Sequence, residues 1–355
     1  MKAALYSPYL DTLGGGEKYI ATIAELLSQK GFEAVFFWDD PKIIKSLSSR
    51  FNLELQKVKV LPNIFKKSGG FLKKWRILHS YDFSFFLSDG SVPMPLAKNN
   101  FLHFQVPFVF KNVKNPANKV KFSRYQGIIC NSNFTKKYID QTFGINSQIV
   151  YPPVDLPLAR NLKKENIILS VGRFFDFLHS KKQEVLIEVF KKMVGDGFSG
   201  WQLFLAGGVI NKKYFLELES IAKGYPIKFF PDLSYGELKS LYSKAKIFWH
   251  AAGFGQDLES HPEKAEHFGI SIVEAMAAGC VPVVFGAGGA FEIIDEGKNG
   301  LFWSDLSKLE SHTLNLVNDQ NRCQEVSSRA VQKSKEFSKA KFKENISQTM
   351  AISLK

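Results

Sequence analysis

The chain has 355 residues and a mass of 40.1 kDa, more than one hydrophobic core usually serves, so two domains are expected. Hydrophobic residues make up 45% of the chain and charged residues 23%, which excludes a largely disordered protein. The three cysteines form no C-x-x-C pair, which argues against a disulfide framework or a structural zinc site and favours a reducing, cytoplasmic location. No run of about 18 apolar residues and no signal-peptide pattern occurs, so we expect a protein that is soluble or peripheral on the inner face of a membrane.

The formal net charge of +13 lies almost entirely in the first part of the chain. Residues 1–150 carry 21 Lys and Arg against 10 Asp and Glu, whereas residues 151–355 carry 26 against 24. Residues 63–78 (NIFKKSGGFLKKWRIL) and 108–124 mix cations with aromatic side chains, which suits an anionic membrane surface or, equally, a solvated lysine-rich loop. Nucleic acid is not an expected partner, because no recognised nucleic-acid module accompanies the charge.

Apolar runs alternate with amphipathic stretches, which predicts βαβ units and parallel sheets covered by helices. In the first part, strands and helices are predicted at residues 2–9, 17–31, 34–38, 127–132 and 133–143. After a Pro-rich and charged linker the rhythm restarts, with elements predicted at residues 167–173, 183–197, 201–208, 213–224, 227–230, 237–245, 246–252, 269–279 and 281–286. The resulting division is a first domain of residues 1–153, a second of 154–335, and a final helix in 336–355 that could return to the first domain.

Two glutamates stand out in the segment EHFGISIVE. Glu266 lies in a polar loop and Glu274 in a helix predicted to begin near Gly269, a separation that lets both carboxylates face one cleft. Gly269 allows a ligand to approach the backbone closely, and the free N–H groups of the first helical turn form an anion site. This combination suits a sugar phosphate, with amides on the phosphate oxygens and carboxylates on the hydroxyls.

Cations follow the first strand of the second domain. Arg173 ends the strand ILSVGR, and Lys181 and Lys182 open the next helix, where α/β sheets bind ligands. Such cations could clamp a diphosphate and stabilise its charge as it leaves, ordinary surface lysines being the alternative.

Glycine turns offer further backbone amides to phosphate. Three glycines follow the first strand and open the first helix: Gly14, Gly15 and Gly16. A second turn, FGAGGAFE, is either a phosphate site or a plain connection, and it contains Gly286, Gly288 and Gly289.

His103, in FLHFQVP, either points into a cleft between the domains or is a structural histidine. The chain contains no D-x-D, G-x-S-x-G, H-E-x-x-H or G-x-x-x-x-G-K-[ST] motif. We therefore expect neither a metal site nor another cofactor, and no common hydrolase mechanism.

These segments resemble the retaining nucleotide-sugar glycosyltransferases of glycosyltransferase family 4, also called glycosyl transferases group 1. The resemblance covers nearly the whole chain and runs through GGGEKY, FLHFQVP, CNSNFTKKYI, YPPVD, ILSVGR, LFLAGG, ELKSLYSKAK, EHFGISIVEAMAAGCVPVV, GGAFEII and GKNGLF. It implies the α/β GT-B fold, in which two Rossmann-like domains with parallel sheets face each other across a cleft. It also implies metal-free transfer of a sugar, with retention, from a nucleotide-sugar donor to a glycan or lipid-linked acceptor.

The resemblance assigns roles to the candidate residues. Arg173 and Lys181 would hold the donor diphosphate, and Glu274 the ribose hydroxyls. Glu266 would hold the transferred sugar together with the backbone of Phe268, Gly269 and Ile270, with Gly289 as a further donor-binding residue. From the first domain, Gly15, Gly16 and His103 would complete the site.

Two segments depart from the family pattern. The segment FFDFLHS after Arg173 is longer than the usual turn, so the donor lysine could be Lys182 instead of Lys181. The loop FGQDLESHPEKA before Glu266 is also long. The spelling EHFGI is most similar to mannosyltransferases that extend lipid-linked oligosaccharides, which makes GDP-mannose the first expectation for the donor.

Two other functions remain open on the sequence. An NAD-dependent oxidoreductase would use the turn Gly14-x-Gly16 and Asp39, which lies near the ribose-binding position of the dinucleotide fingerprint, although Tyr19 replaces the third glycine. A noncatalytic protein would bind membranes or nucleic acid through the basic first part.

Overall fold

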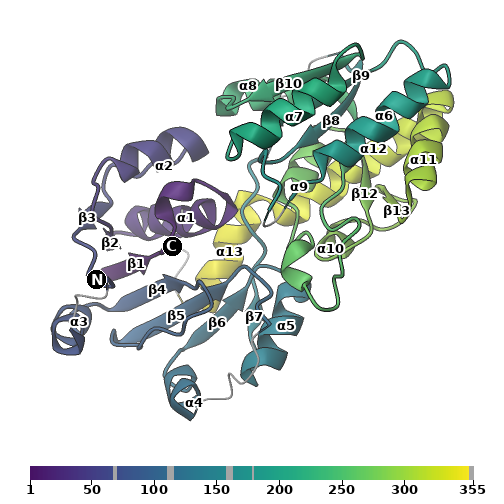
Figure 1. Ribbon diagram of the computed structural model, residues 1–355. Coiled ribbons are helices and arrows are strands. Elements are labelled where there is room, and N and C mark those ends of the chain that lie inside the picture. Colours follow the sequence, from purple (N-terminus) through teal and green to yellow (C-terminus); the bar gives the residue numbers. More distant parts are fainter. Residues whose placement is uncertain (67–69, 110–115, 157–162, 178–179, 352–355) are drawn as a thin grey trace. The chain divides into compact units, whose positions relative to one another are not determined.

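The computed structural model describes residues 1–66, 70–109, 116–156, 163–177 and 180–351. The chain folds into two compact units (Figure 1). The first comprises Met1–Pro153 and Lys339–Lys355, and the second comprises Val154–Ser338. The last helix therefore belongs to the first unit, and the second unit extends three residues beyond the predicted 154–335. No helix among these described residues is both long enough and apolar enough to span a bilayer.

The first unit is built on a seven-stranded parallel sheet in the order β3-β2-β1-β4-β5-β6-β7. Its strands are β1 (Lys2–Tyr6), β2 (Glu33–Phe37), β3 (Lys59–Leu61), β4 (Phe83–Leu87), β5 (Asn99–Phe104), β6 (Gly127–Cys130) and β7 (Gln148–Ile149). Its helices are α1 (Gly15–Gln29), α2 (Ile43–Phe51), α3 (Phe71–Leu78), α4 (Pro116–Phe122), α5 (Asn133–Phe143) and α13 (Lys339–Thr349).

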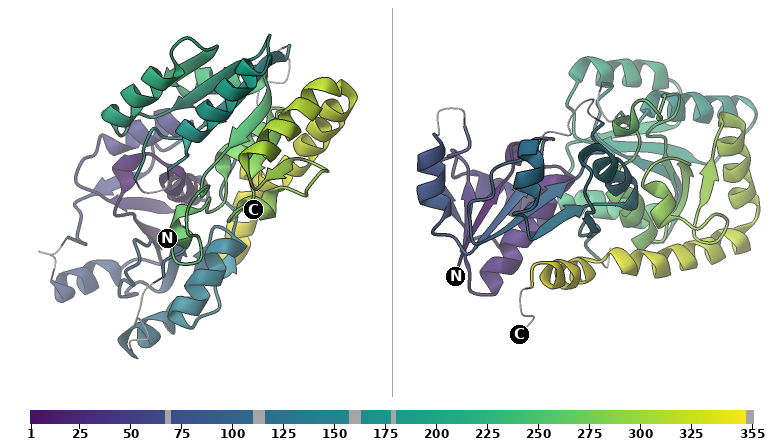
Figure 2. Two further views of the ribbon diagram at one scale, coloured as in Figure 1. Left: turned by 45° about the vertical axis from the view of Figure 1, so that its right-hand side comes forward. Right: turned by 90° about the horizontal axis from the view of Figure 1, so that it is seen from below.

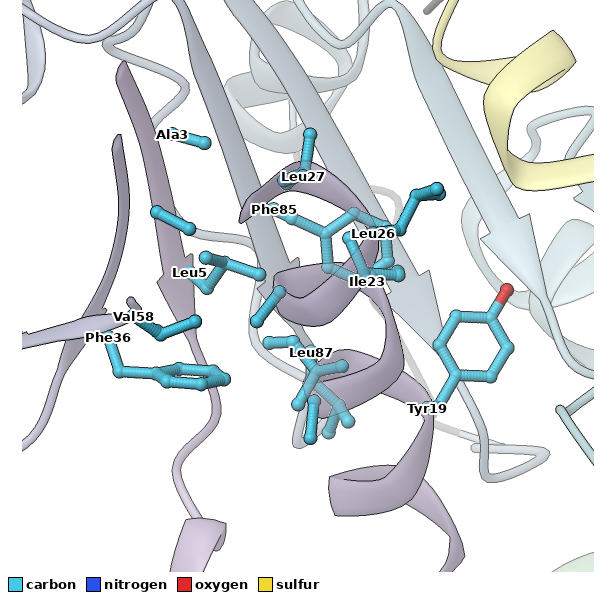
Figure 3. Close-up of a cluster of buried hydrophobic side chains, with 14 of the residues drawn as sticks. Ala3, Leu5, Tyr19, Ile23, Leu26, Leu27, Phe36, Val58, Phe85 and Leu87 are labelled. Carbon is cyan, nitrogen blue, oxygen red and sulfur yellow. The ribbon is translucent and has the colours of Figure 1, made fainter. Parts of the chain in front are cut away.

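Two hydrophobic clusters cover the two faces of this sheet. On one face, Tyr19, Ile23 and Leu26 of α1 pack against strand residues such as Leu5 and Phe85 (Figure 3). Helices α2 and α13 contribute to the same cluster, and helices α3, α4 and α5 contribute to the cluster on the other face. Because both faces are covered, the strands read as nearly continuous apolar runs, as expected of a parallel sheet.

Helix α13 is joined to the first unit by charge as well as by packing. The carboxylate of Glu25, buried on α1, lies 2.9 Å from the Nζ atoms of both Lys339 and Lys343. Burial alone would raise the pKa of Glu25, but the hydrogen bond from the Glu54 backbone and the two lysines lower it below its ordinary value.

The second unit is built on a six-stranded parallel sheet in the order β10-β9-β8-β11-β12-β13. Its strands are β8 (Glu165–Val171), β9 (Gln202–Gly207), β10 (Ile227–Pro231), β11 (Ala245–His250), β12 (Val281–Phe285) and β13 (Leu301–Trp303). Its helices are α6 (Gln183–Gly195), α7 (Lys212–Ala222), α8 (Tyr235–Lys244), α9 (Ile270–Ala277), α10 (Ala290–Ile293), α11 (Leu306–Asn318) and α12 (Gln320–Ser334).

Helices lie on both faces of this second sheet as well (Figure 2). Trp249 of β11 joins the cluster formed by α6, α7 and α11, whereas the preceding Phe248 points to the opposite face and contacts Tyr242 of α8. Both units are thus α/β with parallel sheets, which confirms the predicted fold class.

Candidate active site

The strand order of the second unit places a ligand site by topology. Numbered from its first strand, the order is 3-2-1-4-5-6, so the chain reverses direction across the sheet between β8 and β11. In open α/β sheets, ligands bind beyond the carboxyl ends of the strands at such a switch point. Arg173 follows β8 and His250 ends β11, so both lie at that point. In the part of the chain that the structure describes, the exposed guanidinium of Arg173 makes no ion pair.

Glu266, Lys181 and His250 form one cluster at this switch point. Glu266 Oε2 lies 2.7 Å from Lys181 Nζ and 2.7 Å from His250 Nε2. His250 is buried, and the side chains of Lys181 and Glu266 are only 19% and 12% exposed. The carboxylate is therefore held between a cation and an imidazole in a largely dry site.

The electrostatics of this cluster fix its charges near neutral pH. Burial alone would raise the pKa of Glu266, but the charge of Lys181 and the hydrogen bond from His250 hold it well below its ordinary value. Burial lowers the pKa of His250 by more than the contact with Glu266 raises it. Glu266 is thus ionised and His250 neutral, with the imidazole N–H donating to the carboxylate.

The local backbone brings Lys181, and not Lys182, into contact with Glu266. The aliphatic part of Lys181 crosses Gly172, where a Cβ would lie 2.4 Å from its Cγ atom, so glycine is required for the lysine to reach Glu266. Lys182 adopts a left-handed φ of 54° and its Nζ lies 3.8 Å from Glu184. Gln183 then anchors the start of α6, because its Nε2 donates to the carbonyl oxygen of Arg173 at 3.1 Å.

The amino end of α9 lies directly after Glu266 in the sequence. Gly269 has φ 115° and ψ 53°, a conformation that L side chains rarely adopt, and it turns the chain into the helix. Phe268 is buried, and its ring lies 5.4 Å from that of Phe337. The first amides of the helix, at Ile270 and Ser271, precede its first internal hydrogen bonds and are suited to an anion.

Glu274 lies one helical turn further along α9 and contacts a different set of groups. The buried Tyr242 hydroxyl donates to Glu274 Oε2 at 3.1 Å. Burial, together with the nearby charge of Glu274, raises the pKa of Tyr242 well above its ordinary value. The pKa of Tyr235 is also raised, first by burial and then by the charges of Asp155 and Glu274. Tyr242 on α8 is thus a neutral hydrogen-bond donor that orients the Glu274 carboxylate.

The glycine turn after β12 has a different role from the predicted one. The Gly289 amide donates to the Glu266 carbonyl oxygen at 2.7 Å, and the Gly286 amide donates to Trp303. A Cβ on Gly288 would lie 2.1 Å from the Glu266 oxygen, and one on Gly289 would lie 2.4 Å from the His267 oxygen. The expectation that Gly286 and Gly289 donate to phosphate is therefore corrected: their amides are used within the protein, and the turn supports the backbone that carries Glu266.

In the first unit, Gly15 and Gly16 begin α1, as predicted, after a short 3-10 helix (Leu10–Thr12) that follows β1; their phosphate-binding role stays a prediction. The Gly14 amide is already used, because it donates to Glu17 Oε2 at 2.9 Å in a capping box. A Cβ on Gly16 would meet the amide end of the Gln105 side chain, which would have to move. The strand order of this unit also reverses between β1 and β4, next to these glycines.

His103 is a core residue of the first unit. Its ring has no exposed surface and stacks on Tyr19, with ring centres 3.9 Å apart and planes at 14°. Burial lowers the pKa of His103 to about 3, so the imidazole is neutral at ordinary pH. This burial fits the structural alternative, and the predicted role of His103 in the site stays a prediction.

Asp39, the residue on which the oxidoreductase hypothesis depends, is already occupied. Its carboxylate pairs with Lys66 and accepts a hydrogen bond of 2.9 Å from the Asn63 amide. These contacts tie the end of β2 to the segment after β3. These contacts give Asp39 a structural role that does not depend on binding a ribose.

Glu266 and Lys181 were predicted from the sequence, but the residues that contact the carboxylates of Glu266 and Glu274, His250 and Tyr242, were not. His250 could have been found, because it ends the apolar run KIFWH at the carboxyl end of a strand. Tyr242 could not, because it lies inside an ordinary amphipathic helix. Within the ranges that the structure describes, no group of three His, Cys, Asp or Glu side chains is placed to hold a metal ion.

Comparison with known proteins gives a family for the second unit. Residues 159–333 match the family model described as glycosyl transferases group 1. A GDP-Man:Man(3)GlcNAc(2)-PP-Dol alpha-1,2-mannosyltransferase of Xenopus laevis is 30% identical over 177 residues, which are 46% of this chain and 34% of that protein. The protein of the same name from Dictyostelium discoideum is 24% identical over 256 residues, 66% of this chain and 48% of that protein. The chain thus spans between about a third and a half of the length of these relatives.

The fold of the whole chain also has solved counterparts. The structure of Anabaena Alr3699/HepE in complex with UDP and glucose superposes with a TM-score of 0.70 at 17% identity, covering 99% of each chain. At this identity the likeness concerns the fold, and it extends over both units.

Proposed function

Because the chain belongs, through its second unit, to the glycosyl transferases group 1 family and has the GT-B fold, we propose that it is a glycosyltransferase that uses a nucleotide-sugar donor. The observation that supports this most directly is the cluster of Lys181, Glu266 and His250 at the switch point of the second sheet. A buried carboxylate that is kept ionised beside a cation and a helix amino end matches the hydroxyls and phosphates of such a donor.

The roles follow from the charges of the groups. Arg173 and Lys181 bind the diphosphate, with the first amides of α9 on its oxygens. Glu274, oriented by Tyr242, accepts hydrogen bonds from the ribose hydroxyls. Glu266 accepts hydrogen bonds from the transferred sugar, and the backbone at Gly269 approaches it closely. Lys181 has three N–H groups, so it can keep its contact with Glu266 while it donates to a phosphate.

The chemistry we propose is transfer with retention and without a metal. The bond between the anomeric carbon and the phosphate oxygen breaks, the acceptor oxygen attacks the same face, and its proton passes to the leaving phosphate. Arg173 and Lys181 stabilise the negative charge that develops on that phosphate, the part that a metal ion plays in other transferases. No protein nucleophile is required.

For the donor and acceptor, the relatives suggest a specific pair. The names of the mannosyltransferase relatives specify GDP-mannose and a lipid-linked oligosaccharide, so we propose mannose from GDP-mannose and a lipid-linked glycan as acceptor.

A thermal-shift panel tests the donor. Each of GDP, UDP, ADP, their sugar conjugates and NADH is added to the protein, since a ligand that binds the folded state raises the melting temperature. We expect a shift with GDP and GDP-mannose that persists in EDTA. A shift with UDP compounds alone would contradict the choice of base, and a shift with NADH alone would overturn glycosyl transfer. Turnover that is lost in EDTA and restored by manganese would overturn the metal-free mechanism.

A further inference from the structure

A groove on the first unit contains none of the residues of the candidate active site. It has a volume of about 650 Å³ and is bounded by α3, by the segment before β5 and by the turn before β6. Its lining includes Phe71, Leu72, Trp75, Leu96, Lys98 and Arg124, which together are called the α3 groove below.

Three apolar residues of α3 face solvent. Phe71, Leu72 and Trp75 are 57%, 77% and 46% exposed, although α3 has only eight residues. At 100° per residue these three form one stripe, and Arg76 and Lys73 follow next around the helix. Leu78 is buried and anchors the helix to the core. The exposed stripe is therefore additional to what holds α3 in place.

Side chains at the α3 groove contact their neighbours. The ring of Trp75 stacks on that of His79, with centres 5.3 Å apart and planes at 20°. Lys98 Nζ lies 2.8 Å from Asp82 Oδ1, and Asp82 Oδ2 accepts from the Lys2 amide at 2.8 Å. Asp82, an acidic residue next to the groove, is thus paired.

The surrounding sequence is strongly basic. From residue 55 to residue 139 the chain has 15 Lys and Arg, and its acidic residues are Asp82 and Asp89. Asp89 follows β4 and so lies at the other end of that strand. Helix α4 adds Val120, which is 59% exposed, between Lys119 and Lys121. Lys67 and residues 110–115, which also belong to the basic runs, lie outside the described residues.

The position of the groove separates it from any substrate site of its own sheet. His79, Lys98 and Arg124 precede β4, β5 and β6, so they mark the amino ends of these strands. Gly15 and Gly16 follow β1 and lie at the carboxyl ends. Since α/β sheets bind small ligands at the carboxyl ends, the groove is not explained by the donor or by a Rossmann-type site.

We propose that the α3 groove and the exposed stripe of α3 dock the protein on an anionic lipid bilayer. Aromatic and aliphatic side chains at the tip of a basic surface enter the boundary between headgroups and acyl chains, while the lysines and arginines remain among the anionic headgroups. An anionic bilayer matches this surface in polarity and in charge, because the apolar side chains are surrounded by cations and the nearby Asp82 is paired. This docking does not depend on the donor site of the second unit.

Sedimentation with vesicles tests the charge. The parent protein should sediment with phosphatidylglycerol–phosphatidylcholine vesicles, and much less with pure phosphatidylcholine or in high salt. The triple variant Lys73→Ser, Lys74→Ser, Arg76→Ser should lose roughly 100-fold in partitioning, about fivefold for each cation. The matched control removes three exposed lysines of the second unit (Lys212→Ser, Lys213→Ser, Lys223→Ser) and should partition like the parent. If both triple variants lost the same amount of partitioning, the effect would come from net charge and not from this surface, and the proposal would be overturned.

A second pair of variants tests the apolar stripe. Leu72→Ser with Trp75→Ser should reduce partitioning at unchanged net charge, whereas Leu216→Ser with Ile221→Ser, at exposed positions of α7, should not. Tryptophan emission should shift to the blue on vesicle binding in the parent and not in Trp75→Phe. Binding to single-stranded RNA with none to vesicles, or dimers that the Leu72 and Trp75 changes dissociate, would show that the surface serves another partner and overturn the proposal.

Discussion

The pair of Lys181 and Glu266 makes a prediction about stability that needs no substrate. In Lys181→Met, the Glu266 carboxylate keeps its contact with His250 but loses its cation in a largely buried site. Removing one partner of a fully buried pair costs about 3–5 kcal/mol, and exposed pairs contribute about 0–1 kcal/mol. With side chains 19% and 12% exposed, this pair lies between these limits, so we expect a loss of about 2 kcal/mol in the free energy of unfolding.

For a unit of this size, that loss corresponds to a fall in melting temperature of about 4–8 °C. The control is Lys182→Met, because Lys182 is the next residue and its nearest carboxylate, on Glu184, is 3.8 Å away. The double variant Lys181→Met, Glu266→Gln should recover part of the loss, since the unpaired charge is then removed. If Lys181→Met melts at the same temperature as Lys182→Met, the reasoning about this cluster is refuted.

Two further predictions concern the first unit and the glycine turn. Because burial lowers the pKa of His103 from 6.5 to about 3, only the unfolded chain binds a proton here between these values, and stability falls as pH falls below 6.5. His103→Phe, which keeps the stack on Tyr19, should remove about 2 kcal/mol of the stability lost between pH 7 and pH 5 in urea unfolding. An unchanged pH slope, or the same effect in the exposed control His261→Gln, would contradict this. Gly289→Ala should cost about 1–3 kcal/mol and lower turnover, because its Cβ would meet backbone atoms of His267 and Phe268, whereas Gly236→Ala, with open space around it, should cost nothing in the same thermal melt. Equal melting of the two glycine variants would refute the supporting role of the turn.

The parallel sheets could be predicted because strands covered on both faces are apolar throughout and alternate with amphipathic helices. The same property limits what the sequence can predict for His103. When both faces of a strand are buried, alternation does not tell which side chains reach the carboxyl end and which enter the core. A histidine between phenylalanines in FLHF carries no mark of its stacking partner Tyr19, which is distant in sequence.

At the candidate site, Lys181 and Glu266 were both expected from the sequence, and the structure brings them into contact; their roles stay predictions. That Lys181 and not Lys182 contacts Glu266 depends on the left-handed backbone at Lys182. The Gly289 amide is not free for a ligand because it donates to the Glu266 carbonyl oxygen. Both are long-range consequences of packing. The attachment of α13 through Glu25 is of the same kind, because a lysine-rich helix gives no indication of which carboxylate it will meet.

In the proposed function, the second unit holds a nucleoside diphosphate sugar between Lys181 and Glu274. Calorimetric titration of GDP into the parent, Glu274→Ala and Glu219→Ala tests it most directly, because Glu219 is an exposed glutamate of the same unit on α7. We predict equal affinity for the parent and Glu219→Ala and at least a tenfold loss in Glu274→Ala, since a carboxylate hydrogen bond contributes about 1.5–3 kcal/mol. Equal affinity in all three proteins, with Glu274→Ala folded, would contradict the claim.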